Sequence, residues 1–445
     1  MKKINTSFSL FDFNKKRADK VQLFGRESLD EDGNLIPFIE QAALVTHYLQ
    51  LRNSNVNMPY ANKAQDILEL WYEFIQGEKE QRPNDFVGVS ESAIAYQAYL
   101  FPELFQAPFP APKNPKFTFI DLFAGIGGFR MAFQNLGGEC VFSSEWDEQA
   151  KKTYYANYGE VPFGDITRES IKNKIPKGFD ILCAGFPCQA FSLAGKKLGF
   201  AETRGTLFFD VAEILRRYQP KAFFLENVKG LAIHDKGKTL KTILNTLDEV
   251  GYVVPEPQIV NAMFFGVPQH RERIYIVGFR KDLGLTAEDF SYPEQKEVTK
   301  KWIDVREENP VPAKYYLSTT YQQTLIKHKA RHAAKGNGFG YDIIPDDGIA
   351  HAIVVGGMGR ESNLVIDFRQ KDLTPTTNIK GTVNTDGWRK MTPREWARLQ
   401  GYPDNFKIVV ADASAYKQFG NSVAVPAIQA TATQLLKLLT GKNIL

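Results

Sequence analysis

The chain has 445 residues, of which 43% are hydrophobic and 24% charged, and its formal net charge is +4. These proportions are ordinary for globular proteins and exclude a mostly disordered, collagen-like or disulfide-scaffold chain. Since a single hydrophobic core stops growing at about 250–300 residues, we expect two or more domains.

Residues 1–116 are predicted to form a helical N-terminal extension and a linker. Ile36–Leu51 and Lys63–Gln76 carry apolar residues at helical spacing, and the four prolines of Phe105–Pro115 indicate a linker. This part carries a net charge of −2, against +6 for residues 117–445. We expect a helical arm packed on the rest of the chain, with a helix-turn-helix near Ser90–Ile94 as the alternative.

Residues 117–280 alternate short apolar runs with helical segments. The expected strands are Phe117–Phe123, Cys140–Ser144, Asp180–Ala184, Ala222–Leu225 and Ile274–Gly278, and the expected helices include Val211–Tyr218 and Leu240–Val250. Continuous apolar strands alternating with helices indicate an α/β domain whose largely parallel sheet is covered on both faces.

The regularity disappears after residue 280. Glycine, polar and basic residues dominate residues 281–410, a stretch too long for a connection, so we predict a smaller domain there. Residues 411–445, with a helix over Ala427–Leu439, are predicted to return to the α/β core.

The first predicted strand leads into a glycine-rich turn, FTFIDLFAGIGGFR, over Phe117–Arg130. Gly125 and Gly127 match the first two glycines of the dinucleotide fingerprint, but Arg130 occupies the last position. A plain turn is the alternative at this point. The ends of the next two strands carry Glu145-Trp146-Asp147 and Asp165. Because the carboxyl ends of parallel strands meet at one edge, the pattern predicts an adenosine-type cofactor and argues against a nicotinamide dinucleotide.

Cys188 follows another predicted strand, at the turn Gly185-Phe186-Pro187, whereas Cys140 and Cys183 lie within apolar strands and are expected in the core. A cysteine at a strand end close to a cofactor is a candidate reactive thiolate. Glu226 directly follows an apolar strand, and Gln269–Arg273 (QHRER) supplies two arginines. These residues offer a nucleophile, an acid and fixed cations.

At these residues the sequence resembles DNA (cytosine-5) methyltransferases of the bacterial restriction–modification type. The resemblance covers residues 117–445, with the motifs in the usual order of the family: DLFAGIGG, EWD, GDIT, GFPCQAFS, RGTLFFD, ENV, FGVPQHRERIY, RKMTPREWARLQGYP and QFGNSVAVPA. It implies a Rossmann-like S-adenosylmethionine-dependent core (117–280), a small target-recognition domain (281–410) and a C-terminal segment (411–445) that completes the core.

The resemblance implies transfer of a methyl group from S-adenosylmethionine to C5 of a flipped-out cytosine in double-stranded DNA, with S-adenosylhomocysteine as the second product. Cys188 matches the nucleophile that adds to C6, Glu226 the acid at N3, Arg273 the cation at O2, and Arg271 its support. The residues that match the cofactor site are Phe123, Gly125, Ile126, Gly127, Glu145, Trp146, Asp165, Ile166, Gly185, Leu207, Asn421, Ser422 and Val423.

DNA contacts are expected in the loop Gln189–Gly199, with Gln189 and Ser192, and in the variable segment. No acidic residue occurs from Asn309 to Tyr341, and single-sign charge suits phosphate contact, with a solvated loop as the alternative. The expected contacts there are Lys327, Lys329, Arg331 and Lys335, and the expected base readers are Arg360, Asn363 and Arg369.

The variable segment resembles those of enzymes that recognise CCGG and methylate the inner cytosine, and another CC-containing site is the alternative. A tRNA cytosine-5 methyltransferase, an NAD-dependent oxidoreductase and a catalytically silent DNA-binding regulator are the competing functions. We expect a cytoplasmic bacterial enzyme, associated with the nucleoid when bound to DNA. It is expected to have no membrane span and no metal, and to share its site with a paired restriction endonuclease without forming a stable complex.

Overall fold

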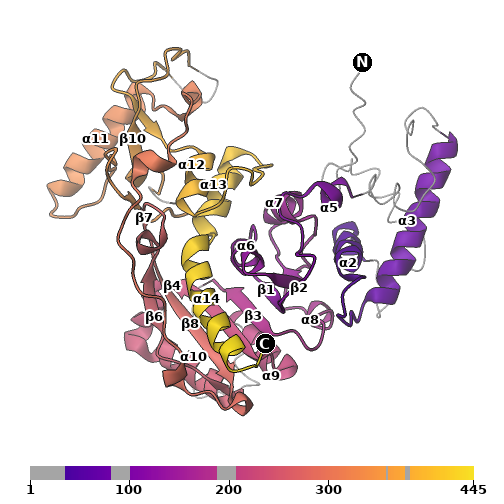
Figure 1. Ribbon diagram of the computed structural model, residues 1–445. Helices are drawn as coiled ribbons and strands as arrows, with labels where there is room; N and C mark the ends of the chain where they lie inside the picture. Colours follow the sequence, from indigo (N-terminus) through magenta and orange to yellow (C-terminus); the bar gives the residue numbers. More distant parts are fainter. Residues whose placement is uncertain (1–35, 82–100, 188–206, 357–358, 376–380) are drawn as a thin grey trace.

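The computed structural model describes residues 36–81, 101–187, 207–356, 359–375 and 381–445 (Figure 1). Its centre is a seven-stranded sheet with the order β2-β1-β3-β4-β8-β5, in which β6 also pairs with β8. The strands are β1 (Phe117–Leu122), β2 (Gly138–Ser144), β3 (Ile181–Gly185), β4 (Ala222–Val228), β5 (Tyr252–Val253), β6 (Gln258–Asn261) and β8 (Glu272–Arg280).

Within the sheet β8 alone runs against the other strands. The pairs β1–β2, β1–β3 and β3–β4 are parallel, whereas β8 is antiparallel to β4, β5 and β6. The expectation of a largely parallel sheet is therefore confirmed, and β8 is the one strand of this sheet, among the described residues, that runs antiparallel. The strand that carries the QHRER motif enters between β4 and β5 from the opposite direction.

Helices cover both faces of the sheet. The side chains of β1 alternate, so that Ile120 packs in one buried cluster and Phe119 in the other. The first cluster includes α2 (Phe38–Leu51), α3 (Ala61–Gln81), α9 (Leu207–Tyr218) and α10 (Lys238–Glu249). The second includes α6 (Gly128–Asn135), α7 (Glu148–Tyr158), α12 (Pro393–Leu399), α13 (Asp412–Asn421) and α14 (Val425–Gly441).

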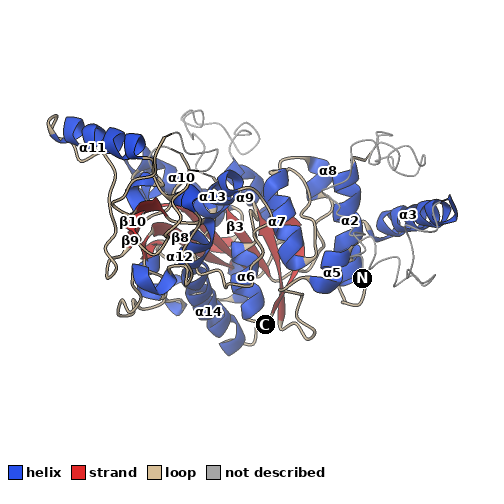
Figure 2. Cartoon of the chain, turned by 90° about the horizontal axis from the view of Figure 1, so that it is seen from above, coloured by secondary structure: helices blue, strands red, loops and turns tan. Residues whose placement is uncertain are grey.

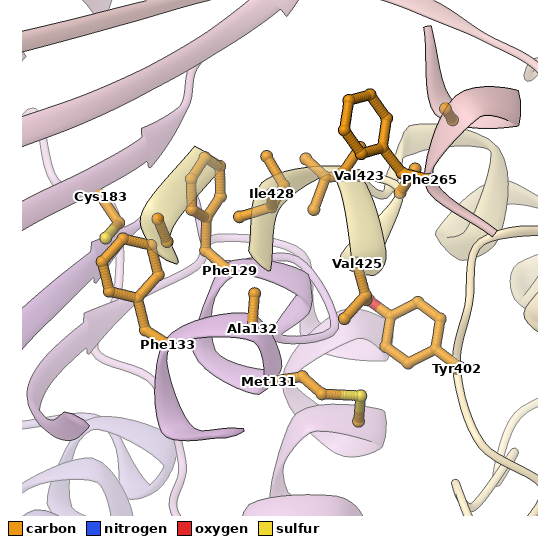
Figure 3. Packing of buried hydrophobic residues seen from close by; sticks show 14 of the residues in the cluster. Phe129, Met131, Ala132, Phe133, Cys183, Phe265, Tyr402, Val423, Val425 and Ile428 are labelled. Atoms are coloured by element: carbon orange, nitrogen blue, oxygen red, sulfur yellow. The ribbon is translucent and has the colours of Figure 1, made fainter. Parts of the chain in front are cut away.

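Figure 3 shows how the C-terminal segment completes the second face. Phe129 and Phe133 of α6 lie between Cys183 of β3 and Ile428 of α14. Cys140 and Cys183 are buried free cysteines, as the apolar strands predict. α14 packs in this core cluster, as do Met391 and Trp396, and so do Trp302 and Val365 of the predicted small domain.

The small domain is built from short elements: β7 (Gln269–His270), α11 (Thr319–Ala333), β9 (Ala350–His351), β10 (Leu364–Ile366) and β11 (Trp388–Lys390). β7 pairs with β9 and β10 with β11. At its centre the buried Arg389 makes a bidentate ion pair with Glu395, and its Nε donates to Asp367 over 3.1 Å. Two small apolar clusters complete this domain.

The predicted strands and helices are all present, with ends shifted by a few residues, but α11 was not predicted. Only Gln322 and Leu325 of this helix are buried, so its sequence lacks the apolar stripe by which a helix is recognised. Figure 2 shows α11 protruding at one end of the molecule and α3 at the other.

The N-terminal helices belong to the core of the molecule. Every residue of α2 is buried or half-buried, and α2 packs between α3 and the edge of the sheet at β2. Two further short helices, α5 (Pro102–Gln106) and α8 (Glu169–Lys172), lie near this edge (Figure 1). This is the packed helical arm that we favoured; residues 90–94, where a helix-turn-helix was the alternative, lie outside the described residues. Within the described ranges, no helix combines the length and apolarity that crossing a membrane requires.

Candidate functional site

The glycine-rich turn connects β1 to α6 at the carboxyl edge of the sheet. Phe123, Gly125 and Gly127 all have positive φ, at 55°, 56° and 81°. A Cβ on Gly127 would lie 2.3 Å from the ring of Tyr158, whereas a Cβ on Gly125 would meet nothing within 4 Å. Gly127 is therefore required by packing, and Gly125 faces open space, where backbone can approach a ligand. Ile126 is buried beneath the turn.

Glu145, at the end of β2, connects this turn to the start of α7. One of its carboxylate oxygens accepts from the Gly125 amide over 2.8 Å, and the other accepts from the amides of Trp146 and Asp147 over 2.9 and 2.8 Å. Burial raises the pKa of Glu145, and these three amides oppose the rise. The carboxylate is thus fixed in place, and about one of its four lone-pair sites is left for a further donor such as a ribose hydroxyl.

Beside Glu145, the indole of Trp146 is 76% exposed, which is unusual for so large an apolar side chain. Asp165, on the segment that pairs with the end of β2 at Phe163, is also exposed, and Ile166 is buried behind it. The structure thus brings an aromatic face, an exposed carboxylate and a fixed carboxylate to one edge of the sheet. This set fits the adenosine part of a cofactor.

The C-terminal segment supplies the other wall. Val423 lies against Gly128 and Gly185, and the Ser422 hydroxyl forms a 2.7 Å hydrogen bond with Tyr402. Asn421 is exposed beside them, and Leu207 is half-buried at the first position of α9. All thirteen predicted cofactor residues are described, and the turn, Glu145-Trp146, Asp165 and this wall lie at the carboxyl ends of β1 to β4.

Glu226 lies on β4 directly opposite Gly185 of β3, and a Cβ on Gly185 would be 3.6 Å from its carboxylate. The side chain is 10% exposed, and Arg273 Nε of β8 is 3.2 Å from its Oε1. Burial raises the pKa of Glu226, and the two arginines Arg273 and Arg271 only partly offset this rise. A buried carboxyl that holds its proton more tightly than usual is suited to act as an acid.

Arg271 has a different position from Arg273. It is 2% exposed, and its guanidinium donates to the carbonyl oxygens of Ile353, Gly420 and Ser422 over 2.8, 3.1 and 2.7 Å. Burial lowers its pKa, and Arg273 lowers it further. Arg271 therefore holds the small domain and the C-terminal segment beside the site, and acts there as a positioning residue.

The predicted nucleophile Cys188, together with Gln189 and Ser192 of the expected closing loop, lies outside the described residues. The chain is described up to Pro187, and Asn227 of β4 donates from its amide to the Phe186 carbonyl over 2.8 Å. This buried asparagine was not predicted as a site residue, although its place in the ENV motif was a usable signal. Asn227 fixes the backbone that leads to Cys188 to the strand that carries Glu226.

Gln269 is a second residue that the sequence did not reveal. It is fully buried, its amide donates to the Leu399 carbonyl over 2.9 Å, and its carbonyl accepts from the Ile353 amide over 3.0 Å. The QHRER motif predicts charged groups at the site, but it gives no sign that its neutral residue Gln269 has a structural role.

The predicted DNA contacts divide into two groups. Lys327, Lys329, Arg331 and Lys335 are exposed on α11 and just after it, and Arg360 is exposed with its guanidinium over the ring of Tyr416. Asn363, which we expected to read a base, has no exposed surface. It is fully buried, because its side chain is hydrogen-bonded to the amide and the carbonyl of His351 at the β7–β9 sheet. Arg369 is likewise held by Asp367 and the carbonyls of Glu307 and Glu308.

Asp121 of β1 lies below the glycine-rich turn. It is 1% exposed, and neither carboxylate oxygen has a hydrogen-bond partner among the described residues. Burial raises its pKa to about 8, although Arg130 lowers it and Glu145 and Glu160 raise it further. The carboxyl is therefore protonated at neutral pH in the folded chain.

We expect Asp121→Asn to change how stability depends on pH. An unfolded aspartate has a pKa of about 4. The folded wild type therefore loses free energy of unfolding, by a few kcal/mol, as the pH rises from about 4 to 8. The asparagine variant lacks this loss. The difference between its urea midpoint of unfolding and that of the wild type should therefore increase, in favour of the variant, from pH 5 to pH 9. Asp66→Asn, at an exposed position of α3, is the control; an advantage for Asp121→Asn that does not change with pH would contradict the prediction.

A cavity of about 730 Å³ lies at the opposite, amino ends of the strands, where Asn53, Lys113, Thr118 and Lys177 are among its lining residues. None of the predicted site residues lines it. Across the described part of the chain, no three histidine, cysteine, aspartate or glutamate side chains are grouped as a metal site would require.

Comparison with known proteins relates the chain to one enzyme family. Residues 117–437 match the family described as C-5 cytosine-specific DNA methylase. The chain is 71% identical over 336 residues to the type II methyltransferase M.HpaII of Haemophilus parainfluenzae, covering 74% of this chain and 93% of that protein. It is 46% identical over 340 residues to M1.ScrFI of Lactococcus lactis subsp. cremoris, covering 76% and 82% of the two chains.

Among solved structures, the Dnmt2 methyltransferase of S. pombe matches with a TM-score of 0.53 at 19% identity, over 74% of this chain and all of that chain. The methyltransferase EhMeth of Entamoeba histolytica matches with the same TM-score at 20% identity, over 74% and 98% of the two chains. At such identity these two matches show a shared fold. The family match spans most of the chain, and the two relatives named above are 71% and 46% identical, so this protein belongs to the C-5 cytosine-specific DNA methylases and is a DNA (cytosine-5) methyltransferase.

Proposed function

We propose that this enzyme transfers the methyl group of S-adenosylmethionine to a flipped-out cytosine through a covalent bond between Cys188 and C6. The observation that carries the proposal is the buried Glu226–Arg273 pair, which lies beside Gly185 at the end of the strand that leads to Cys188. An acid and a cation beside the end of the strand that precedes Cys188 in the sequence fit activation of a pyrimidine ring better than a hydride transfer or a DNA-binding role without catalysis.

The cofactor, when bound, supplies an electrophilic methyl group on a sulfonium sulfur. Trp146 would stack on the adenine, Glu145 would accept from a ribose hydroxyl, and Asp165 would accept from the adenine amino group. Phe123, Gly125 and Ile126 would border the cofactor on one side, and Asn421, Ser422 and Val423 on the other. The open space over Gly125 and the exposure of Trp146 support this assignment.

In the proposed reaction the Cys188 thiolate adds to C6 of cytosine, and the C5–C6 double bond becomes a nucleophilic C5 centre. Glu226 donates its proton to N3, and Arg273 stabilises the charge at O2, so that charge does not accumulate on the ring. C5 would then form the bond to the methyl carbon as the bond from that carbon to the sulfonium sulfur breaks, leaving S-adenosylhomocysteine. Transfer of the C5 proton to water, return of the N3 proton to Glu226 and expulsion of the Cys188 thiolate would restore the aromatic ring and the free enzyme.

The target base is inaccessible within a duplex, so the reaction requires it to be flipped into the site, as is general for enzymes that modify bases. The basic side chains Lys327, Lys329, Arg331, Lys335 and Arg360 are exposed on the small domain and would contact phosphates or bases. A tRNA substrate is the alternative, and the 71% identity to a type II methyltransferase favours DNA.

We propose CCGG as the recognition site, with the inner cytosine as the target. The support is the resemblance of the variable segment to enzymes that read CCGG, together with an identity to M.HpaII of 71% against 46% to M1.ScrFI. We expect transfer of labelled methyl to a duplex containing CCGG and none to a scrambled duplex. Methylation only at another CC-containing site would overturn the target, and transfer to tRNA alone would overturn the DNA assignment.

The type II relatives also support a role in a restriction–modification system, in which a paired endonuclease cuts the same unmethylated site without binding this enzyme. We propose that the protein acts in the bacterial cytoplasm, at the nucleoid when it is bound to DNA. We expect host DNA to be cut by the endonuclease when this enzyme is inactivated.

A further inference from the structure

The helix α2 lies outside the residues that match the methylase family, which begin at residue 117. It nevertheless makes polar contacts with the catalytic core next to the proposed adenosine site. We propose that α2 is part of the cofactor site: it positions the segment Glu160–Arg168, which carries Asp165 and Ile166, and so sets the affinity for S-adenosylmethionine. This inference rests on the proposed function.

The first contact holds the start of that segment. Thr46 Oγ1 of α2 donates to the Ala42 carbonyl over 2.8 Å and accepts from the Val161 amide over 3.0 Å. Thr46 and Val161 are both fully buried, so without Thr46 the amide would lose its acceptor in a place from which water is excluded. Thr46 therefore determines where the segment leaves α7.

The second contact holds the middle of the segment. The His47 ring of α2 lies 4.3 Å from the ring of Phe163, and its Nε2 is 3.1 Å from Glu160 Oε1. Burial alone would raise the pKa of Glu160, but Arg130 and His47 lower it to about 2, so the carboxylate is charged and firmly held. Phe163 in turn accepts at its carbonyl from the Glu145 amide over 2.9 Å. Through Phe163, α2 thus supports both Asp165 and Glu145.

The third contact holds the end of the segment. Glu40 Oε1 of α2 lies 2.6 Å from Arg168 Nη1, three residues after Asp165. Glu40 also offsets the charge of the buried Lys151 on α7, whose pKa is lowered by burial. Asp165, the exposed residue whose carboxylate would meet the adenine, therefore lies on a segment held by α2 on both sides.

The test compares variants of Thr46. Thr46→Val keeps the size of the side chain but removes the acceptor for Val161, whereas Thr46→Ser keeps that acceptor. We expect Thr46→Val to weaken binding of S-adenosylmethionine about 3–10-fold, the cost of one lost buried hydrogen bond that is partly relieved by movement of the segment. Thr46→Ser is expected to restore binding to within about twofold. The measurements are calorimetry of S-adenosylmethionine without DNA, and KM and kcat with DNA.

A role limited to stability would lower the melting temperature without a change in cofactor affinity. We therefore expect the KM for S-adenosylmethionine to rise in Thr46→Val while kcat at saturating cofactor stays within about twofold. Glu40→Gln, at a half-exposed ion pair, is expected to weaken cofactor binding about twofold. Glu69→Gln, at an exposed position of α3, is the matched control and should change neither quantity.

Unchanged cofactor affinity in a folded Thr46→Val and in Glu40→Gln would overturn the inference. If the wild type binds S-adenosylmethionine and methylates DNA, and if these variants behave like the wild type, the proposed function remains intact. Wild-type protein that binds no S-adenosylmethionine would instead overturn the proposed function itself.

Discussion

Replacing Cys188 with alanine is expected to abolish methyl transfer, lowering kcat by about 10⁴-fold or more, while binding of S-adenosylmethionine changes by less than about twofold. Without the thiolate, C5 of cytosine has no route to a nucleophilic state, and the remaining groups can only bind and orient the base. The loss is measured as incorporation of labelled methyl into duplex DNA at saturating substrates. Cofactor binding is followed separately by calorimetry.

DNA that carries 5-fluorocytosine at the target position makes this test specific for the covalent step. Fluorine at C5 cannot leave as a proton does, so the thiolate cannot be expelled and a complex stable to denaturation should accumulate with the wild type. The Cys188→Ala variant should form none. Cys140→Ala, which removes a thiol buried in the second core cluster, is the control and should still form the complex. A trapped complex in the absence of Cys188 would contradict the proposed nucleophile.

Replacing Glu226 with glutamine is expected to lower kcat by about 10²–10³-fold, the usual contribution of a positioned acid, with little change in cofactor binding. Glutamine has the same shape and can stay beside Arg273, but it cannot transfer a proton to N3. Because burial raises the pKa of Glu226, the wild type keeps its acid to a higher pH than an exposed glutamate would. The wild-type activity should therefore fall as the pH rises through that pKa.

In Glu226→Gln this decline should be absent, because no proton remains to be lost at the position. The rising part of the profile, which follows formation of the thiolate, should persist. The measurement is kcat/KM against pH for both proteins on one duplex. A variant with the full wild-type profile at a uniformly lower rate would contradict the role of Glu226 as an acid. Glu249→Gln, at the exposed end of α10, is a control on another helix.

The sequence predicts the α/β core well because each strand there is a continuous apolar run, and each strand end carries the residues of one motif. The alternation of Phe119 and Ile120 between two buried clusters is the physical form of that pattern. The reversed direction of β8 was not predictable in the same way. An apolar run of β-branched and aromatic residues is equally suited to either direction, and only pairing with β4 decides it.

The site shows a similar limit. Residues whose chemistry is unusual for their position, such as Glu226 after an apolar strand, stand out in the sequence. The sequence does not indicate that Asn363 is buried. An asparagine that is hydrogen-bonded to a neighbouring backbone looks the same in a sequence as one that contacts a DNA base. Asn227 and Gln269 were missed for the converse reason, since their hydrogen bonds join segments about 40 and 130 residues away.

Arg271 has a consequence for how enzymes of this type acquire new targets. Its guanidinium holds the carbonyls of Ile353, Gly420 and Ser422, and β7 pairs with β9 a few residues before Ile353. The two ends of the segment between β8 and β9 are thus held in place by hydrogen bonds to backbone atoms. These bonds do not depend on the side chains within the segment. Insertions and exchanges within it can therefore accumulate over generations and change the DNA sequence that we propose it reads, while Glu226 and Arg273 keep their places.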